Sequence, residues 1–185
     1  MGAGVSVAGA GLCVRGRGGV VLGLVLGLVL SGCSSGPGES PAGPVNLGDP
    51  HDFALALFDA ANAERSDAGL AELAWSECLA DAAAPRAAAS LGTAPLTHEP
   101  LPSPCTPGAT AGENLSRTWR TASEVVELWM ESEAHRANIL NPAFTHSGIS
   151  CIAYSHEDPA RGVEGGAEGG AEQGGMVCSE LFEGS

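Results

Sequence analysis

Positive charge is scarce in this sequence, and lysine is absent from it. All 22 acidic residues follow Cys33, whereas two of the eight basic residues precede it. The part after Cys33 therefore has six basic residues and a net charge of −16. A domain this acidic is repelled by phosphate backbones and by anionic lipid surfaces. Nucleic acid is therefore not an expected partner, and we attribute the acidity to solubility.

Three catalytic or metal-binding signatures are also missing from the part that can fold. It has no HExxH pair that would fix two histidines on one helix, no Gly-x-Ser-x-Gly elbow and no CxxC pair. The corresponding zinc protease, serine hydrolase and thiolate metal sites are therefore not indicated. No nucleophile stands out from the sequence.

Long apolar runs are limited to one, from Val20 to Leu30, which is too short to span a bilayer comfortably. Two arginines precede this run and Leu-Ser-Gly-Cys ends it, which predicts a secretory signal over residues 1–32. The Leu-Ser-Gly-Cys box resembles that of bacterial lipoproteins, in which cleavage leaves the cysteine as a lipidated N-terminus. This resemblance implies that Cys33 is a diacylated anchor in the cell membrane. Plain secretion is the alternative.

The stretch after the anchor is dominated by Ser, Gly and Pro and predicts a flexible tether over residues 33–50. Residues 51–185 are enough for one domain with a single buried core. Within them, Gly-Gly-Ala-Glu occurs twice in tandem, and this predicts a disordered loop insertion over residues 162–175.

Four cysteines fall in the predicted domain, at positions Cys78, Cys105, Cys151 and Cys178. An even number in an exported chain favours disulfides. Three pairings are possible, and the spacing does not decide among them. Pairing Cys78 with Cys105 and Cys151 with Cys178 closes the two shortest loops. A metal site made of four thiolates is the alternative, but the wide spacings argue against it.

The apolar periodicity predicts helices followed by strands, and hence an α+β domain. Helices are expected over 51–68, 76–91 and 122–131, with a further turn over 134–140. Ser76 is a candidate N-cap of the second helix, and Pro85 should kink or interrupt that helix. Short extended segments are expected over 73–75, 147–154 and 175–182. Residues 92–111 are expected to be a loop that leads into a Gly-Glu-Asn turn at 112–114.

An ordered set of short motifs covers nearly all of the predicted domain, from Phe53 to Phe182. In order these are Asn62…Arg65…Gly69-Leu70, Leu96-Thr97-His98, Gly112-Glu113-Asn114-Leu115, Trp129-Met130, His135-Arg136, Asn138-Ile139-Leu140 and Gly148-Ile149. The set resembles the bacterial branch of the CAP superfamily, named after cysteine-rich secretory proteins, antigen 5 and plant pathogenesis-related proteins, and also called the SCP domain. The resemblance implies a three-layer α-β-α sandwich.

The same resemblance implies a cleft with two histidines and two acidic residues, which in some members holds a divalent metal such as zinc or calcium. By motif, His98 and His135 are the histidines and Glu113 is the first acidic residue. Direct alignment puts Ser132 at the second acidic position, and Glu131 could replace it only if the helix continues past Ser132. We expect a break at Ser132, because a serine there can cap the following turn.

Three hypotheses follow for the function. The leading one is a monomeric, membrane-tethered lipoprotein outside the cytoplasm of a bacterium, which binds a lipid, glycan or protein at the cell envelope and is not an enzyme. The second is a metal-dependent hydrolase that uses His98, Glu113 and His135. The third is a structural domain in which these side chains only hydrogen-bond the buried backbone.

Overall fold

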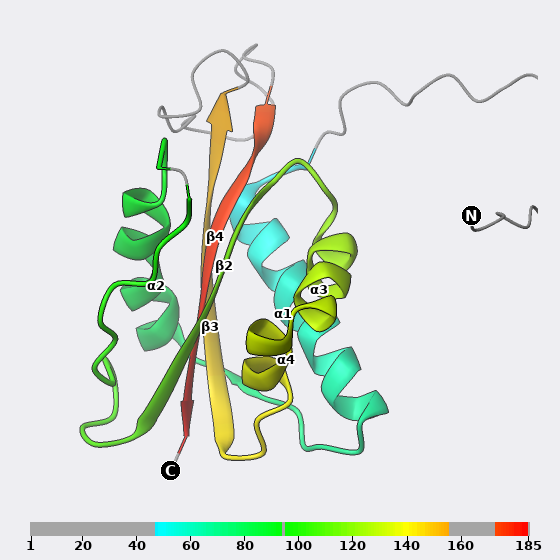
Figure 1. Ribbon diagram of the computed structural model, residues 1–185, viewed down its shortest axis with the longest axis vertical. Helices are drawn as coiled ribbons and strands as arrows, with labels where there is room; N and C mark the ends of the chain where they lie inside the picture. Colours follow the sequence, from blue (N-terminus) through cyan, green and yellow to red (C-terminus); the bar gives the residue numbers. More distant parts are fainter. Residues whose placement is uncertain (1–46, 94, 156–172, 185) are drawn as a thin grey trace, which may run out of the picture. The chain divides into compact units, whose positions relative to one another are not determined.

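The computed structural model describes residues 47–93, 95–155 and 173–184 (Figure 1). The predicted signal segment, Cys33, most of the tether and most of the 162–175 loop lie outside these residues. The elements, in chain order, are α1 (Pro50–Asp67), β1 (Ala74–Trp75), α2 (Glu77–Ala89), β2 (Thr110–Thr118), α3 (Ala122–Glu131), α4 (Glu133–Ile139), β3 (Phe144–Ser155) and β4 (Gln173–Gly184). Among the described residues, no helix is both long and apolar enough to cross a membrane.

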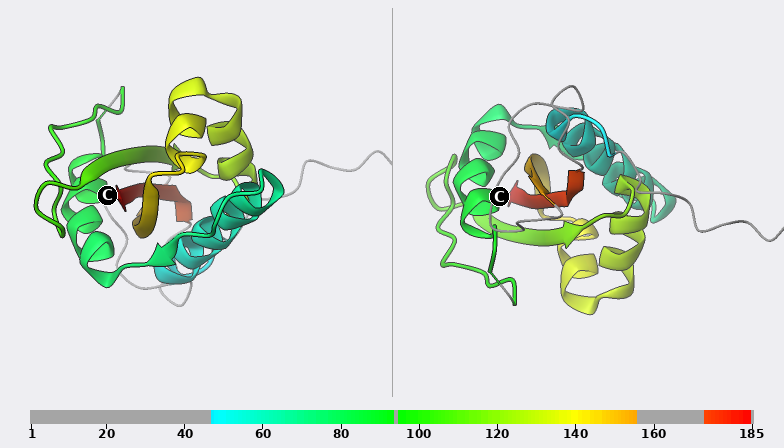
Figure 2. Two further views of the ribbon diagram at one scale, coloured as in Figure 1. Left: turned by 90° about the horizontal axis from the view of Figure 1, so that it is seen from below. Right: turned by 90° about the horizontal axis from the view of Figure 1, so that it is seen from above.

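The described strands form one mixed sheet in the order β1-β3-β4-β2, covered by helices on both faces. The β1–β3 pair is parallel, whereas β3–β4 and β4–β2 are antiparallel. Figure 2 shows α2 on one face and α1, α3 and α4 on the other. This arrangement confirms the predicted three-layer α-β-α sandwich.

The helix α1 contributes a buried polar side chain as well as its apolar stripe. Phe53 and Leu57 face the main core, and Arg65 on the same helix is only 1% exposed. Its guanidinium donates to four backbone carbonyls, those of Ala71, Ile139, Asn141 and Phe144. These hydrogen bonds replace those that a buried arginine would otherwise lose to water, and they connect α1 to the turn before β3.

The third helix ends at Ser132, as expected. Ser132 has extended backbone angles and separates α3 from α4, although its side chain makes no capping hydrogen bond. Thr121 and Glu124 form a capping box at the start of α3. Trp129 is buried in the core, whereas the preceding Leu128 is 44% exposed.

One further expectation about elements was wrong, and another was wrong in part. The Gly-Glu-Asn segment at 112–114 is not a turn but lies within the nine-residue strand β2. The helix α2 is also not interrupted at Pro85, which is exposed and occupies one position of a continuous helix. Ser76 caps α2 as predicted, because its side chain accepts from the Leu79 amide.

The four cysteines of the domain form two disulfides, as expected. Cys78 on α2 pairs with Cys105 in the loop before β2, and Cys151 on β3 pairs with Cys178 on β4. This is the pairing with the shortest loops. Cys151 and Cys178 are directly opposite each other in the β3–β4 register, so this disulfide connects the two central strands.

Candidate functional site

The strand β2 presents consecutive residues to opposite faces of the sheet, and this separates two roles within its Gly-Glu-Asn motif. Glu113 points towards α2, where it contacts Arg86. Asn114 points towards α4, where its amide donates to the His135 carbonyl and accepts from Asn138. A Cβ atom at position 112 would lie 2.9 Å from the Asn138 side chain, so the glycine permits this close approach.

The carboxylate of Glu113 is the centre of the site. Arg86 on α2 donates to both of its oxygens, from Nε to Oε1 at 2.5 Å and from Nη2 to Oε2 at 2.9 Å. Ser179 on β4 donates to Oε1 at 2.9 Å. Nδ1 of His98, from the loop between α2 and β2, lies 2.8 Å from Oε2. Each carboxylate oxygen of Glu113 therefore has two hydrogen-bond partners, and the Glu113 side chain is only 4% exposed.

These contacts determine the charge of the site. Burial alone would raise the pKa of the Glu113 carboxyl, but hydrogen bonds from Arg86, His98 and Ser179 outweigh burial and hold this pKa below its usual value. The hydrogen bond to Glu113 in turn raises the pKa of Arg86. Both groups are charged at neutral pH, so the centre of the site is a paired anion and cation.

The two predicted histidines differ in their surroundings. His98 is 52% exposed at the side chain while it contacts Glu113. His135 on α4 is half-buried, and burial, followed by the nearby charge of His98, lowers its pKa. The ring of His135 makes no hydrogen bond within the described part of the chain and lies 6.4 Å from the Trp129 ring, between centroids.

Glu131 does not take part in the site. It is exposed at the end of α3, and the break at Ser132 removes the helical spacing that would have placed it beside His135. The second acidic position of the motif therefore has no carboxylate from this helix. The site consists of Glu113, His98, Arg86 and Ser179, and the last two were missed by the sequence analysis.

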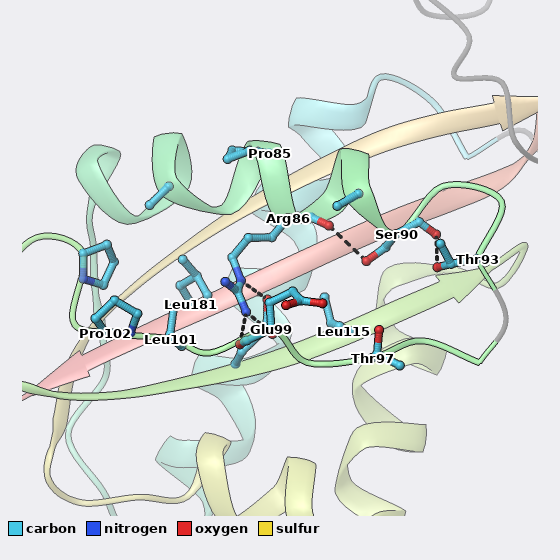
Figure 3. A pocket seen from close by; sticks show the side chains of 14 residues that line it. Pro85, Arg86, Ser90, Thr93, Thr97, Glu99, Leu101, Pro102, Leu115 and Leu181 are labelled. Carbon is cyan, nitrogen blue, oxygen red and sulfur yellow. Dashed lines mark hydrogen bonds and ion pairs between the residues drawn. The ribbon is translucent and has the colours of Figure 1, made fainter.

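A cavity of about 450 Å³ lies beside the Arg86–Glu113 pair (Figure 3). Its walls come from α2, the segment that follows α2, and the strands β2 and β4. The apolar lining residues are Ala82, Pro85, Ala89, Leu101, Pro102, Pro104, Leu115 and Leu181. The polar lining residues are Arg86, Ser90, Thr93, Thr97, Glu99 and Glu113. The cavity thus has an apolar interior with a charged pair on its wall.

A family model described as the cysteine-rich secretory protein family, CAP, matches residues 58–159, which is more than half of the chain. The chain belongs to the CAP family. This finding confirms the resemblance seen in the motifs.

Relatives of known sequence or structure are also similar to this chain. Uncharacterized protein YkwD of Bacillus subtilis is 56% identical over 43 residues, which are 23% of this chain and 17% of that protein. An outer surface protein of Borrelia burgdorferi has the same fold, with a TM-score of 0.52 and 16% identity over 74% of this chain and 95% of that one. An extracellular SCP-domain protein of Bacillus anthracis is 21% identical over 78% of this chain and 45% of that one, with a TM-score of 0.47. This chain thus matches only part of the length of some of its relatives.

A divalent metal does not fit the CAP site of this chain. Within residues 47–93, 95–155 and 173–184, no three or more His, Cys, Asp or Glu side chains are placed to hold a metal ion. Both oxygens of Glu113 already accept from the Arg86 guanidinium. A metal would need those oxygens as ligands and would lie next to a fixed positive charge. The geometry therefore gives no support to a metal-dependent hydrolase built on His98, Glu113 and His135.

Proposed function

We propose that this protein is a membrane-tethered, extracytoplasmic CAP-domain lipoprotein that binds a small amphipathic molecule at a bacterial cell envelope. The observation that carries the proposal is the cavity of about 450 Å³ beside the Arg86–Glu113 pair. Its volume falls in the range of sites for small ligands, about 300–1,000 Å³, and its walls are mainly apolar with a few polar groups, as such sites are.

The polar groups of the cavity favour a lipid-like ligand over a glycan. The hydroxyl of Ser90 already donates to the Arg86 carbonyl, and that of Thr93 donates to the Ser90 carbonyl. A sugar needs several free hydrogen-bonding groups in its binding site, whereas an apolar chain binds by burying its surface away from water. Leucine, proline and alanine side chains provide the surface for such a chain.

The charges of the cavity favour an uncharged polar group on the ligand. Glu113 neutralises Arg86, and the carboxylate of Glu99 adds a negative charge at the same wall. An anionic head group would therefore meet repulsion that a hydroxyl or an ester would not. We expect a long-chain alcohol to bind more tightly than the carboxylic acid of the same length at pH 7.

Two alanines of α2 provide a matched test. Both Ala88 and Ala89 are exposed on α2, but only Ala89 lines the cavity. Ala89→Trp should fill the cavity, and Ala88→Trp should add the same surface outside it. Titration with the uncharged dye Nile red, followed by displacement with dodecanol or dodecanoate, should show binding at least tenfold weaker in Ala89→Trp only. Equal binding by the wild type and both variants would contradict the cavity as the site.

The location is tested separately, since Cys33 lies outside the described residues. Two of the structural relatives are an extracellular and an outer surface protein, which agrees with export of this chain. Cys33→Ser should move the protein from the membrane fraction to the medium in a bacterial host that processes lipoproteins. Retention of the Cys33→Ser protein in the membrane would contradict the lipid anchor.

A further inference from the structure

Arg86 satisfies the Glu113 carboxylate in a way that leaves no room for another cation. A carboxylate has about four lone-pair positions for hydrogen bonds or metal ligation. On Glu113, Arg86 Nε and Ser179 Oγ occupy the two positions of Oε1. Arg86 Nη2 and His98 Nδ1 occupy those of Oε2. All four positions therefore have partners from the chain itself.

The position of Arg86 is also fixed from its other side. Its Nη2 donates to the Glu99 carbonyl at 2.8 Å, in the segment that forms one wall of the cavity. The arginine side chain is only 17% exposed. A guanidinium held by a bidentate pair and a third acceptor has little freedom to move away when another cation approaches.

We propose that Arg86 is the resident cation of this CAP site and that it excludes a divalent metal from Glu113. A metal ligand on Glu113 would lie about 2.0–2.2 Å from the oxygen, where the guanidinium now donates. Arg86 would then be left half-buried, without its partner and beside a doubly charged ion. In addition, Nδ1 of His98 donates to the ionised carboxylate, so this nitrogen cannot share a metal with Glu113 in this geometry.

The consequence is a site whose shape does not depend on metal supply. Arg86 connects α2, the 97–104 segment and β2 through Glu113 and the Glu99 carbonyl. These three parts of the chain, together with β4, form the walls of the cavity. A cell-envelope protein of this design would keep its cavity in the presence of chelators, because the cation is covalently part of the chain.

The test is a calorimetric Zn²⁺ titration of the full chain, purified without chelator and with its disulfides intact. The wild type should bind Zn²⁺ no better than Glu113→Gln, which measures the background from other side chains. Arg86→Gln should free the Glu113 carboxylate and gain a site that binds at least tenfold more tightly than the background. The double variant Arg86→Gln/Glu113→Gln should lose that site again. A wild type that binds Zn²⁺ through Glu113, or an Arg86→Gln variant that gains no site, would overturn the proposal.

A second comparison covers the case in which Arg86→Gln does not fold. His98 is half-exposed, so His98→Ala should fold normally. If Arg86 excludes the metal from Glu113, adding Glu113→Gln to His98→Ala leaves the Zn²⁺ affinity unchanged; a further loss of Zn²⁺ affinity in this double variant would refute the exclusion. Dye binding to the cavity is measured independently, so the exclusion of metal and the proposed ligand site can fail separately.

Discussion

Replacing Glu180 with glutamine should stabilise the protein in a strongly pH-dependent way. Glu180 lies on the central strand β4 and is 0% exposed. Ser147 donates to its Oε1 at 2.9 Å, but its Oε2 has no hydrogen-bond partner within the described residues. Burial raises the pKa of this carboxyl to about 8, against the opposing effects of the Ser147 hydrogen bond and the charge of Arg65. The side chain is therefore protonated in the folded protein at neutral pH.

The sign and size of the effect follow from proton linkage. The pKa of Glu180 is raised from 4.5 in the unfolded chain to about 8 in the folded one. Between these values the folded state holds a proton that the unfolded state has lost, so stability falls as the pH rises. Each pH unit costs about 1.4 kcal/mol, which amounts to about 3 kcal/mol at pH 7 and at most about 5 kcal/mol above pH 8. Glutamine has nearly the same shape and stays uncharged, so Glu180→Gln avoids this loss.

The measurement is urea unfolding of the oxidised protein at pH 4, 6 and 8. The variant and the wild type should be about equally stable at pH 4, and the advantage of the variant should grow at each higher pH. Glu183→Gln is a matched control on the same strand. The pKa of Glu183 is lowered, because hydrogen bonds from Ser103, Cys105 and Thr106 outweigh the effect of burial. Its replacement should destabilise the protein at neutral pH. A difference between Glu180→Gln and the wild type that is constant from pH 4 to 8 would refute the assignment of a neutral Glu180.

Three further predictions concern stability. Arg65→Met should cost about 3–5 kcal/mol in urea unfolding, because four backbone carbonyls lose their donor and two of these hydrogen bonds are buried. A cost below about 1 kcal/mol would contradict this role. The Cys78–Cys105 disulfide joins two residues that are 27 positions apart, and its loss in the Cys78→Ser/Cys105→Ser variant should lower the free energy of unfolding by about 3–4 kcal/mol. The unmodified domain should show no free thiol in non-reducing mass spectrometry. In thermal unfolding Gly148→Ala should destabilise the protein much more than Gly69→Ala, because a Cβ at 148 would lie 2.3 Å from the α2 backbone. Gly69 has a positive φ but open space around it, so Gly69→Ala should cost only about 1–2 kcal/mol. Equal effects of the two substitutions would argue against close packing at Gly148.

The helices and their ends could be predicted because their signals are local. Ser76 before α2 and the predicted break at Ser132 occur in the structure, and α3 has the predicted bounds 122–131. Capping residues and apolar spacing act within one or two turns, so the sequence contains most of what decides them. The buried residues Val125, Val126 and Trp129 of α3 also follow this spacing.

The strand β2 could not be predicted from its own residues. Its segment, TAGENLSRT, has a glycine and several polar side chains, and alternation of apolar with polar residues is absent from it. Two of these polar side chains are buried and find partners on other elements: Glu113 on α2 and Asn114 on α4. Strand formation here depends on pairing with β4 along the whole of β2, and that pairing is not visible in a local pattern.

Some residues of the candidate site were also out of reach of the sequence, because their contacts are long-range. The motifs that identify the family contain His98, Glu113 and His135, but the partner that determines the chemistry of Glu113 is Arg86, 27 residues earlier in the chain. One signal was available, since Arg86 is the only basic residue in an alanine-rich helix. A lone charge of that kind, in a domain with very few basic residues, calls for a search for a buried acid. Had Glu113 been unpaired, burial would have favoured a protonated carboxyl or a bound cation. Because Arg86 meets this need from within the chain, motif residues that accommodate a metal in some relatives here form a closed ion pair beside an apolar cavity.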